Sequence, residues 1–414
     1  LDPSAPPQHI PPGVSVLLRV ASDAVPVQPR NVSFLLVMYA EYNAKEVRFV
    51  SFSPVLRAWV RRQPRLKRVL GGALRTAALG KHTLAAQFPI LIQPRTRTMA
   101  LAITAHCNLS CDGCRYGRDF MTGRQMTLPL IRQVLNDASG LGVYAVRLYG
   151  GEPLLHPDLP AMVRHAWSAG IKPWVTTNGI LLRQRIDGLY EAGLRQLTIG
   201  LYGTGADYDS YVQRKGAFAL LEKGLEYVRD RYGMTVDIKL CFLLSRRTAE
   251  IAALRNAWEF TERLKAFFSV DLIHYSLPYF TYGSDQSLEF RPEDASRIQA
   301  VAEELLEIHA RRPDLYRESP ASIRSIPDWL LRGSGMRVPC DMYDFLWIGA
   351  DGSVQLCYAH FPLGNVHERP LRDIAYQAAH KEAARKAFQL DCPNCHCERE
   401  TRIQKHLPSL RRYR

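Results

Sequence analysis

The chain lacks any long apolar run. Its longest candidate, residues 32–39, falls far short of the roughly 20 apolar residues that span a bilayer. No signal peptide is visible, although the sequence begins with Leu rather than Met. Hydrophobic residues at 47% and aromatic residues at 10% give the composition of a globular protein. We therefore expect no transmembrane segment and a cytoplasmic location.

Acidic residues are missing from two segments that are rich in lysine and arginine. Residues 55–81 carry eight basic residues and residues 401–414 carry five. Without these 13, the remaining 41 basic residues nearly balance the 40 acidic ones. The formal charge of +14 is thus assigned to two appendages, which disfavours a nucleic-acid binder that uses its whole surface.

Cysteines are absent from most of the chain and concentrated in clusters. The nine residues are Cys107, Cys111 and Cys114, then Cys340 and Cys357, then Cys392, Cys395 and Cys397, with Cys241 alone. An odd number at the spacings of metal ligands favours metal binding in a reducing compartment over a disulfide framework. Cys241 lies in an apolar run, which predicts a core residue.

The first cluster lies on a polar loop, residues 104–118, directly after the apolar residues 99–103. Its spacing is C-x3-C-x2-C. A structural zinc or a closed cluster takes four protein ligands, whereas a cubane held by three thiolates keeps one iron open. Zinc would need a fourth ligand, and His106, beside Cys107 on the same loop, is poorly placed. The spacing therefore predicts a set of three metal ligands that leaves a metal site open.

Strand-like and helix-like segments alternate from residue 99 onward. The apolar runs are residues 100–104, 145–149, 173–176, 196–201, 236–244 and 270–275, and the helical stretches are residues 128–141, 159–169, 182–192, 217–232 and 248–265. Six such repeats predict an α/β fold, a partial (β/α)6 TIM-like barrel. Active residues of these barrels lie at the C-terminal strand ends.

Polar and glycine-rich motifs follow these runs. They are Gly150, Gly151, Glu152 and Pro153; Thr176, Thr177, Asn178 and Gly179; Tyr202, Gly203, Thr204 and Gly205; and, further on, Arg214. Paired glycines permit close backbone approach to a ligand, and a carboxylate suits a cation. Each motif alone is an ordinary turn sequence. Together, at one face of a barrel, they predict a ligand site.

These motifs resemble those of the radical S-adenosylmethionine (SAM) superfamily across residues 99–290. Cys-Asn-Leu-Ser-Cys-Asp-Gly-Cys matches its cysteine loop, Gly-Gly-Glu-Pro its methionine-amine motif, and Thr-Thr-Asn-Gly its third-strand motif. The resemblance implies a 4Fe-4S cluster on Cys107, Cys111 and Cys114 whose open iron chelates SAM. Reductive cleavage of SAM would yield a 5′-deoxyadenosyl radical that abstracts hydrogen from the substrate. An external reductase such as flavodoxin or ferredoxin is implied as a partner.

The same resemblance assigns roles to the strand-end motifs. Residues 150–152 would meet the methionine amine of SAM, Thr177 and Asn178 would lie near its ribose, and Arg214 would pair with its carboxylate. The relatives have Ser-Leu-Asp-Gly after the fourth strand, where this chain has Gly-Leu-Tyr-Gly at residues 200–203. Recognition of the SAM carboxylate is therefore expected to depend more on Arg214. The bottom of the substrate pocket is expected to be rebuilt around Tyr202.

A second cysteine module lies in residues 340–400. Residues 346–356 contain two strand-like runs about a Gly-Ala-Asp-Gly turn, which predicts a hairpin that brings Cys340 near Cys357. The region resembles the SPASM/twitch extension of radical SAM enzymes, with its Asp-Gly-x-Val-x-x-Cys and Gly-Asn-Val signatures. Five cysteines, rather than about seven, imply the shorter twitch form with one auxiliary 4Fe-4S cluster.

The resemblance implies Cys340, Cys357, Cys392 and Cys395 as the auxiliary ligands. Cys397 or His396 can replace one of them. A zinc ribbon is the alternative, because C-x2-C paired with a hairpin also makes a zinc site.

Aromatic residues gather after the sixth strand-like run. Most are expected to pack in the core. His274 and Tyr275, together with Tyr202, are the candidates for a catalytic group that accepts a proton beside a substrate radical.

Residues 55–81 have apolar residues at helical spacing with arginines between, and Pro64 is expected to begin a second helix. Two interpretations stay open for this basic amphipathic pair. Its arginines face water, or they contact an anionic surface, a nucleic acid or an acidic leader peptide.

Six segments are expected: a disordered arm at 1–13, an α+β accessory region at 14–98, the barrel at 99–290, a helical connector at 291–339, the auxiliary module at 340–400, and a basic tail at 401–414. The predicted function is a radical SAM oxidoreductase acting on a peptide or small natural product, by a two-electron oxidation in which the auxiliary cluster accepts an electron. The alternatives are a sugar or aminocyclitol dehydrogenase of the same superfamily and, from another class, a non-enzymatic zinc and nucleic-acid-binding protein.

Overall fold

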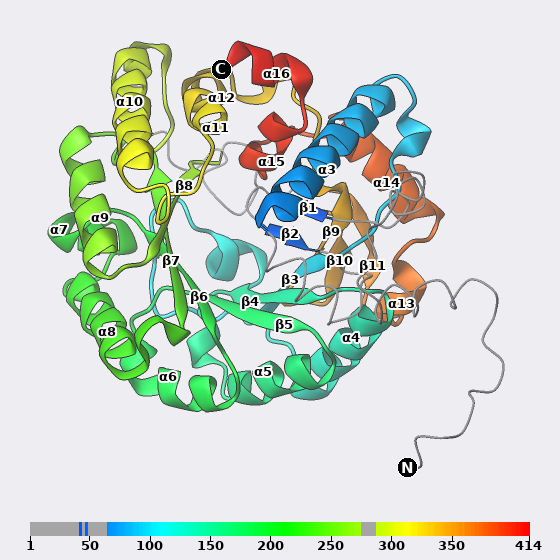
Figure 1. The fold of residues 1–414 in the computed structure, drawn as a ribbon. Helices are drawn as coiled ribbons and strands as arrows, with labels where there is room; N and C mark the ends of the chain where they lie inside the picture. Colours follow the sequence, from blue (N-terminus) through cyan, green and yellow to red (C-terminus); the bar gives the residue numbers. More distant parts are fainter. Residues whose placement is uncertain (1–40, 44–45, 49–63, 275–286, 359) are drawn as a thin grey trace, which may run out of the picture. The chain divides into compact units, whose positions relative to one another are not determined.

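The computed structural model describes residues 41–43, 46–48, 64–274, 287–358 and 360–414 (Figure 1). The chain forms two compact units, Leu1–Leu74 and Arg75–Arg414. In the first unit, β1 (Glu41–Asn43) and β2 (Glu46–Arg48) pair as an antiparallel hairpin. None of the described helices is long and apolar enough to cross a membrane.

The basic helix α3 (Pro64–Ala85) begins at the proline, as predicted. The expected arm at residues 1–13 and the first basic helix before Pro64 lie outside the described residues. At the C-terminal end of α3, His82 Nε2 lies 3.1 Å from the Tyr343 hydroxyl. This part of α3 therefore packs within the second unit.

A nine-stranded sheet organises the second unit, in the order β11-β10-β9-β3-β4-β5-β6-β7-β8. Six parallel strands run from β3 to β8: β3 (Thr98–Thr104), β4 (Ala145–Gly150), β5 (Lys172–Thr177), β6 (Gln196–Leu201), β7 (Asp237–Leu244) and β8 (Phe267–Leu272). The first five are at the predicted positions, and β8 begins and ends three residues before the predicted run at 270–275. The connecting helices are α4 (Leu128–Gly140), α5 (Leu159–Ser168), α6 (Leu182–Glu191), α7 (Gly205–Val212), α8 (Ala217–Tyr232) and α9 (Ile251–Arg263). The α/β partial barrel is confirmed.

Side chains alternate across each parallel strand, because successive residues of a strand point to opposite faces. Ile238, Leu240 and Phe242 of β7 are buried in the main core, on the face that the surrounding helices cover (Figure 1). Lys239 and Cys241 lie between them and belong to the opposite face, which we call the inner face. The hydrophobic periodicity of the strands thus separates a packed outer face from an inner face with polar positions.

The auxiliary module extends this sheet. β9 (Phe345–Ile348) pairs in parallel with β3, and β10 (Ser353–Gln355) and β11 (Pro362–Asn365) follow in antiparallel order. The predicted hairpin therefore exists as β9 and β10. The remaining helices are α10 (Ala295–Arg311), α11 (Pro320–Arg324), α12 (Ile326–Arg332), α13 (Leu371–Ile374), α14 (Ala378–Phe388), α15 (Arg399–Gln404) and α16 (Leu407–Arg412).

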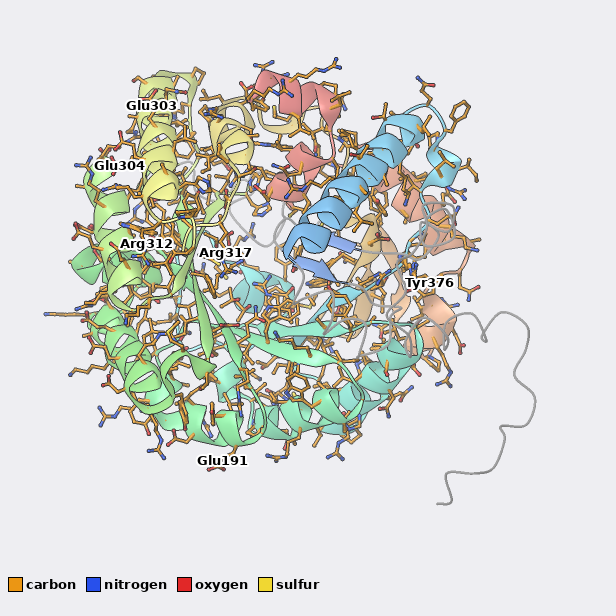
Figure 2. The ribbon with its side chains drawn as sticks, in the orientation of Figure 1. Glu191, Glu303, Glu304, Arg312, Arg317 and Tyr376 are labelled. Atoms are coloured by element: carbon orange, nitrogen blue, oxygen red, sulfur yellow. The ribbon has the colours of Figure 1, made fainter. Side chains whose placement is uncertain are left out.

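Two contacts fix these peripheral elements. The Tyr376 hydroxyl, between α13 and α14, donates to the Leu141 carbonyl at 3.2 Å (Figure 2). On α10, the buried Glu304 carboxylate accepts two hydrogen bonds from Arg255 of α9, at 3.0 and 2.7 Å. The module and α10 are thus tied to the barrel by polar contacts as well as by packing.

Residues 401–414 are not a basic appendage, which corrects the expectation from charge counting. Arg402 is 1% exposed, stacks 4.6 Å over Trp329 and donates to the Pro339 carbonyl at 3.3 Å. Lys405 pairs with Asp341 at 2.8 Å. These cations balance buried carbonyls and a carboxylate that lie far away in the sequence, so local composition could not show their structural role.

Candidate functional site

The cysteine loop follows β3 and is docked on the end of α7. The Asp112 amide donates to the Tyr211 carbonyl at 2.8 Å, and the Asp112 side chain forms an ion pair with Arg247. Cys107 is exposed, whereas Cys111 and Cys114 are half-buried. The loop therefore presents three free thiols from a fixed backbone.

Arg118 closes this loop from within. Its Nε donates to the Cys114 carbonyl at 3.0 Å and its Nη2 donates to the Cys111 carbonyl at 3.1 Å. Burial raises the pKa of both cysteines, and the Arg118 charge opposes that rise. The guanidinium thus favours the thiolate forms that bind metal. Sequence reasoning missed this residue, because an arginine four positions after a cysteine is no distinctive signal.

Gly150 and Gly151 bring the end of β4 against the cysteine loop. A Cβ on Gly151 would lie 2.3 Å from the His106 carbonyl oxygen, and one on Gly150, where φ is 138°, would lie 2.1 Å from the Thr104 oxygen. The Glu152 amide then donates to the His106 carbonyl at 2.7 Å. These glycines were expected to admit a ligand, and the structure gives them this backbone contact.

Glu152 is completely buried behind the loop. Its carboxylate accepts hydrogen bonds from the Leu154 amide at 2.9 Å, the Thr177 hydroxyl at 2.6 Å and the Asn178 amide at 2.8 Å. Burial raises the pKa of Glu152 to about 7. Within the described residues, no basic side chain forms an ion pair with it. A cation arriving beside Glu152 would stabilise its ionised form.

The pKa of Glu152 allows its role in SAM binding to be tested by changing the pH. Below about pH 7 the Glu152 carboxyl is mostly protonated, and above about pH 7 it is mostly a carboxylate. If Glu152 receives the ammonium group of SAM, as the resemblance implies, the carboxylate form is the one that attracts it. We expect SAM binding to tighten as the pH rises through about 7, and Glu152→Gln to weaken SAM binding about tenfold at the alkaline end. Equilibrium dialysis of SAM against pH measures both effects.

Glu191→Gln is the matched control, because Glu191 is an exposed carboxylate at the end of α6 (Figure 2). It should keep the wild-type profile. A Glu152→Gln protein that keeps the same pH profile would exclude this carboxylate from SAM binding.

Asn108, within the cysteine loop, joins the other predicted residues. Its side-chain oxygen accepts from Asn178 Nδ2 at 2.7 Å, and its carbonyl accepts from Arg214 Nη1 at 3.4 Å. The Thr177 hydroxyl donates a hydrogen bond to Glu152 and accepts one from the Gly179 amide at 3.0 Å. The structure thus brings the motifs at residues 150–152, 177–178 and 214 together around the cysteine loop.

Tyr202 lies on the cysteine-loop side of β6. Its ring stacks on Tyr211, with centroids 4.3 Å apart and planes 15° apart, and the Cys111 thiol lies near both tyrosines. Burial raises the pKa of Tyr202 well above its usual range. Near neutral pH this tyrosine therefore stays protonated and forms an aromatic wall beside the loop.

His274 follows β8 and lies beside the auxiliary cysteines. Its Nε2 is 3.8 Å from Cys397 Sγ, and its ring lies 4.2 Å from the His396 ring. Burial lowers the pKa of His274 to about 4, so its imidazole is neutral at physiological pH. Tyr275, the other predicted catalytic residue, lies outside the described residues.

All five cysteines of the C-terminal module line one pocket, which is otherwise bordered mainly by apolar side chains and by Asn394 and Arg402. The loop at residues 392–397 is held there by Arg402, which donates to the Cys395 carbonyl, and by Asn394 Nδ2, which donates to the Met336 carbonyl at 2.7 Å. The predicted hairpin and the distant C-x2-C-x-C segment thus form a single thiol-rich pocket.

The donors in this pocket suit a cluster. In the described part of the chain, no three His, Cys, Asp or Glu side chains converge on a position for one metal ion. The Cys397 thiol hydrogen-bonds to Cys395 and holds the pKa of Cys395 below its usual range. The five cysteines that line the pocket can supply the four thiolates that a 4Fe-4S cluster takes.

The two cysteine sites agree with two known families. Residues 101–242 match the radical SAM superfamily, so the chain contains a radical SAM domain. Residues 340–398 match an iron–sulfur cluster-binding domain, SPASM. The chain thus combines a radical SAM domain with a C-terminal SPASM domain, and such domains bind SAM and 4Fe-4S clusters.

Relatives and solved structures cover different parts of the chain. It is 32% identical over 155 residues to a GTP 3′,8-cyclase of Chlorobaculum tepidum, covering 37% of this chain and 47% of the cyclase, about half its length. It is 25% identical over 301 residues to an AdoMet-dependent heme synthase of Methanosarcina barkeri, covering 67% and 81%.

Among solved structures, Streptococcus suis SuiB bound to its precursor peptide SuiA has a TM-score of 0.55 at 14% identity, covering 90% of this chain and 77% of SuiB. Native anSMEcpe with bound AdoMet and the Cp18Cys peptide has a TM-score of 0.54 at 17% identity, covering 74% and 87%. At such identities these likenesses establish a shared fold.

Proposed function

We propose that this chain is an oxidoreductase that removes hydrogen from a peptide or a small natural product. When bound, the 4Fe-4S cluster and SAM supply a 5′-deoxyadenosyl radical. The thiols of Cys107, Cys111 and Cys114 would hold that cluster, Glu152 would receive the ammonium group of SAM, and Arg214 its carboxylate. Asn108 positions these groups, because it bonds to both Asn178 and Arg214.

The observation that carries this proposal is the contact between the auxiliary pocket and the inner face of the barrel. Tyr358 lines the pocket, and its hydroxyl accepts a hydrogen bond from Arg147 of β4 at 3.1 Å. Cys397, in the same pocket, touches His274 after β8. An electron acceptor in this pocket would therefore adjoin a substrate bound within the barrel.

The position of the pocket suits a two-electron oxidation. Abstraction removes one hydrogen atom from the substrate, and the remaining substrate radical must lose a proton and one electron to become the oxidised product. A cluster on Cys340, Cys357, Cys392 and Cys395 would accept that electron, and an external reductase such as flavodoxin or ferredoxin would reduce the SAM-site cluster. The peptides bound by SuiB and anSMEcpe support a peptide substrate for this chain.

Metal content tests this proposal directly. Anaerobically reconstituted protein should contain about eight iron and eight sulfide per chain, as two 4Fe-4S clusters require, and should form 5′-deoxyadenosine from SAM and dithionite. One or two zinc ions without iron, and no visible iron–sulfur absorption, would contradict it and favour the zinc and nucleic-acid-binding alternative.

A further inference from the structure

A row of polar side chains crosses the inner face of the barrel. In the parallel register, Thr176 of β5 pairs with Thr198 of β6, and Thr198 pairs with Lys239 of β7. Arg147 of β4 joins the row because its Nε donates to the Thr176 hydroxyl at 2.8 Å. The row contains two cations, Arg147 and Lys239, and neither belongs to the cluster or SAM sites described above.

Arg147 is held in one orientation. Besides Thr176, its Nη1 donates to the Tyr358 hydroxyl at 3.1 Å, and its guanidinium lies 4.7 Å over the Tyr149 ring. These two bonds use two of its five N–H groups. The other three have no acceptor, and no carboxylate forms an ion pair with Arg147, in the part of the chain that the structure describes. Such a fixed, half-satisfied guanidinium is preorganised for an oxoanion.

Lys239 adds a second positive charge to the same space. Its pKa is raised, chiefly by the Cys241 thiol and further by the Asp271 carboxylate, so the lysine stays charged at neutral pH. The charged groups that face it are Arg147, Asp271 and Glu398. No carboxylate lies within ion-pair distance of Lys239 among the described residues.

The balance of these charges selects the anion. Among the described residues near Lys239, two cations stand against two carboxylates, so this part of the inner face is close to neutral. A polyphosphate would gain little attraction there and would be repelled by Asp271 and Glu398. A single carboxylate can accept two parallel hydrogen bonds from one guanidinium. It needs only the local excess of positive charge around Arg147.

The row of polar side chains lies a few residues before the SAM motifs along the strands. Arg147 precedes Gly150 by three residues on β4, about 10 Å along a strand, and Thr176 directly precedes Thr177 on β5. A substrate anchored by Arg147 would therefore point its next few bonds toward the C-terminal strand ends.

We propose that Arg147 and Lys239 bind a carboxylate of the substrate on the inner face of the barrel. This inference rests on the proposed function, because it takes the bound molecule to be the substrate, and it names the class: molecules with a free carboxylate. In a peptide, that group is an acidic side chain or the C-terminus.

Calorimetry on the anaerobic holoenzyme with SAM tests the site with N-acetylglycine, its uncharged amide and methyl phosphate as probes. N-acetylglycine should bind at least about tenfold more tightly than the amide, and Arg147→Gln and Lys239→Met should each weaken it about tenfold. Arg147→Lys should restore part of the affinity. Arg164→Gln on α5 and Lys223→Met on α8 are matched controls at exposed positions outside the barrel and should bind like wild type.

Equal binding of acid and amide, no binding of the acid, or unchanged binding in both Arg147→Gln and Lys239→Met would overturn the proposal. Tighter binding of methyl phosphate would overturn the carboxylate assignment. Failure of the proposed function has a different signature: wild-type protein would form no 5′-deoxyadenosine, while carboxylate preference and its loss in Arg147→Gln would still support the anion site. Melting curves identify a variant that fails to fold, and Lys239→Met then tests the site independently.

Discussion

Cys111→Ala is expected to abolish 5′-deoxyadenosine formation from SAM and dithionite, down to the level of a protein-free control. A cubane with one open iron needs three thiolates, and the two that remain on the cysteine loop would not hold it. Cys111 is the central thiol, and its carbonyl is held by Arg118. Chromatography of the nucleoside products after anaerobic reconstitution measures the effect, and iron should fall by about four per chain.

Ser110→Ala is the matched control for this variant. Ser110 is the exposed neighbour of Cys111 on the same loop, and its backbone amide bonds to the Val212 carbonyl at 3.4 Å. Removal of its hydroxyl should leave nucleoside formation intact. If Cys111→Ala cleaves SAM at the wild-type rate, the cysteine loop takes no part in the mechanism.

Cys340→Ala is expected to remove the auxiliary cluster and spare the radical chemistry. Iron should fall from about eight to about four per chain, SAM should still be cleaved without substrate, and substrate oxidation should stop. The physical reason is the separation of the two thiol sets, which lie on different loops and line different sites. Iron analysis and product formation in parallel samples measure the two outcomes.

A comparison of Cys395→Ala with Cys397→Ala identifies the fourth ligand. Cys395 has the lowered pKa, because the Cys397 thiol hydrogen-bonds to it, so it is the better thiolate. We expect Cys395→Ala to lose the auxiliary iron like Cys340→Ala, and Cys397→Ala to keep it. The reverse result would make Cys397 the ligand, and full iron in Cys340→Ala would contradict the assigned pocket.

The parallel strands were predictable because each is a local apolar run bounded by polar or glycine-containing turns. The same holds for the hairpin of β9 and β10, where a short turn joins two apolar segments. The cysteine loop and the motif at residues 150–152 follow their strands directly, so their places at the C-terminal strand ends followed from the fold class.

Long-range partners could not be predicted. Asn108, Arg118 and Arg147 show no distinctive local pattern, and their roles depend on carbonyls and hydroxyls supplied by other elements. The tail was misjudged for the same reason, since Arg402 is buried against carbonyls of residues before β9. His274 was predicted to face the substrate, and the structure adds its contact with Cys397.

The sequence by itself determined the repeating β/α pattern, the three-thiol loop and the existence of a second thiol module, because each depends on residue spacing within a few dozen positions. Only the tertiary structure decided that β9 pairs with β3, that five cysteines from three segments share one cavity, and that Arg147 is fixed by Tyr358. These contacts join residues up to about 250 positions apart, and packing of the whole second unit selects them.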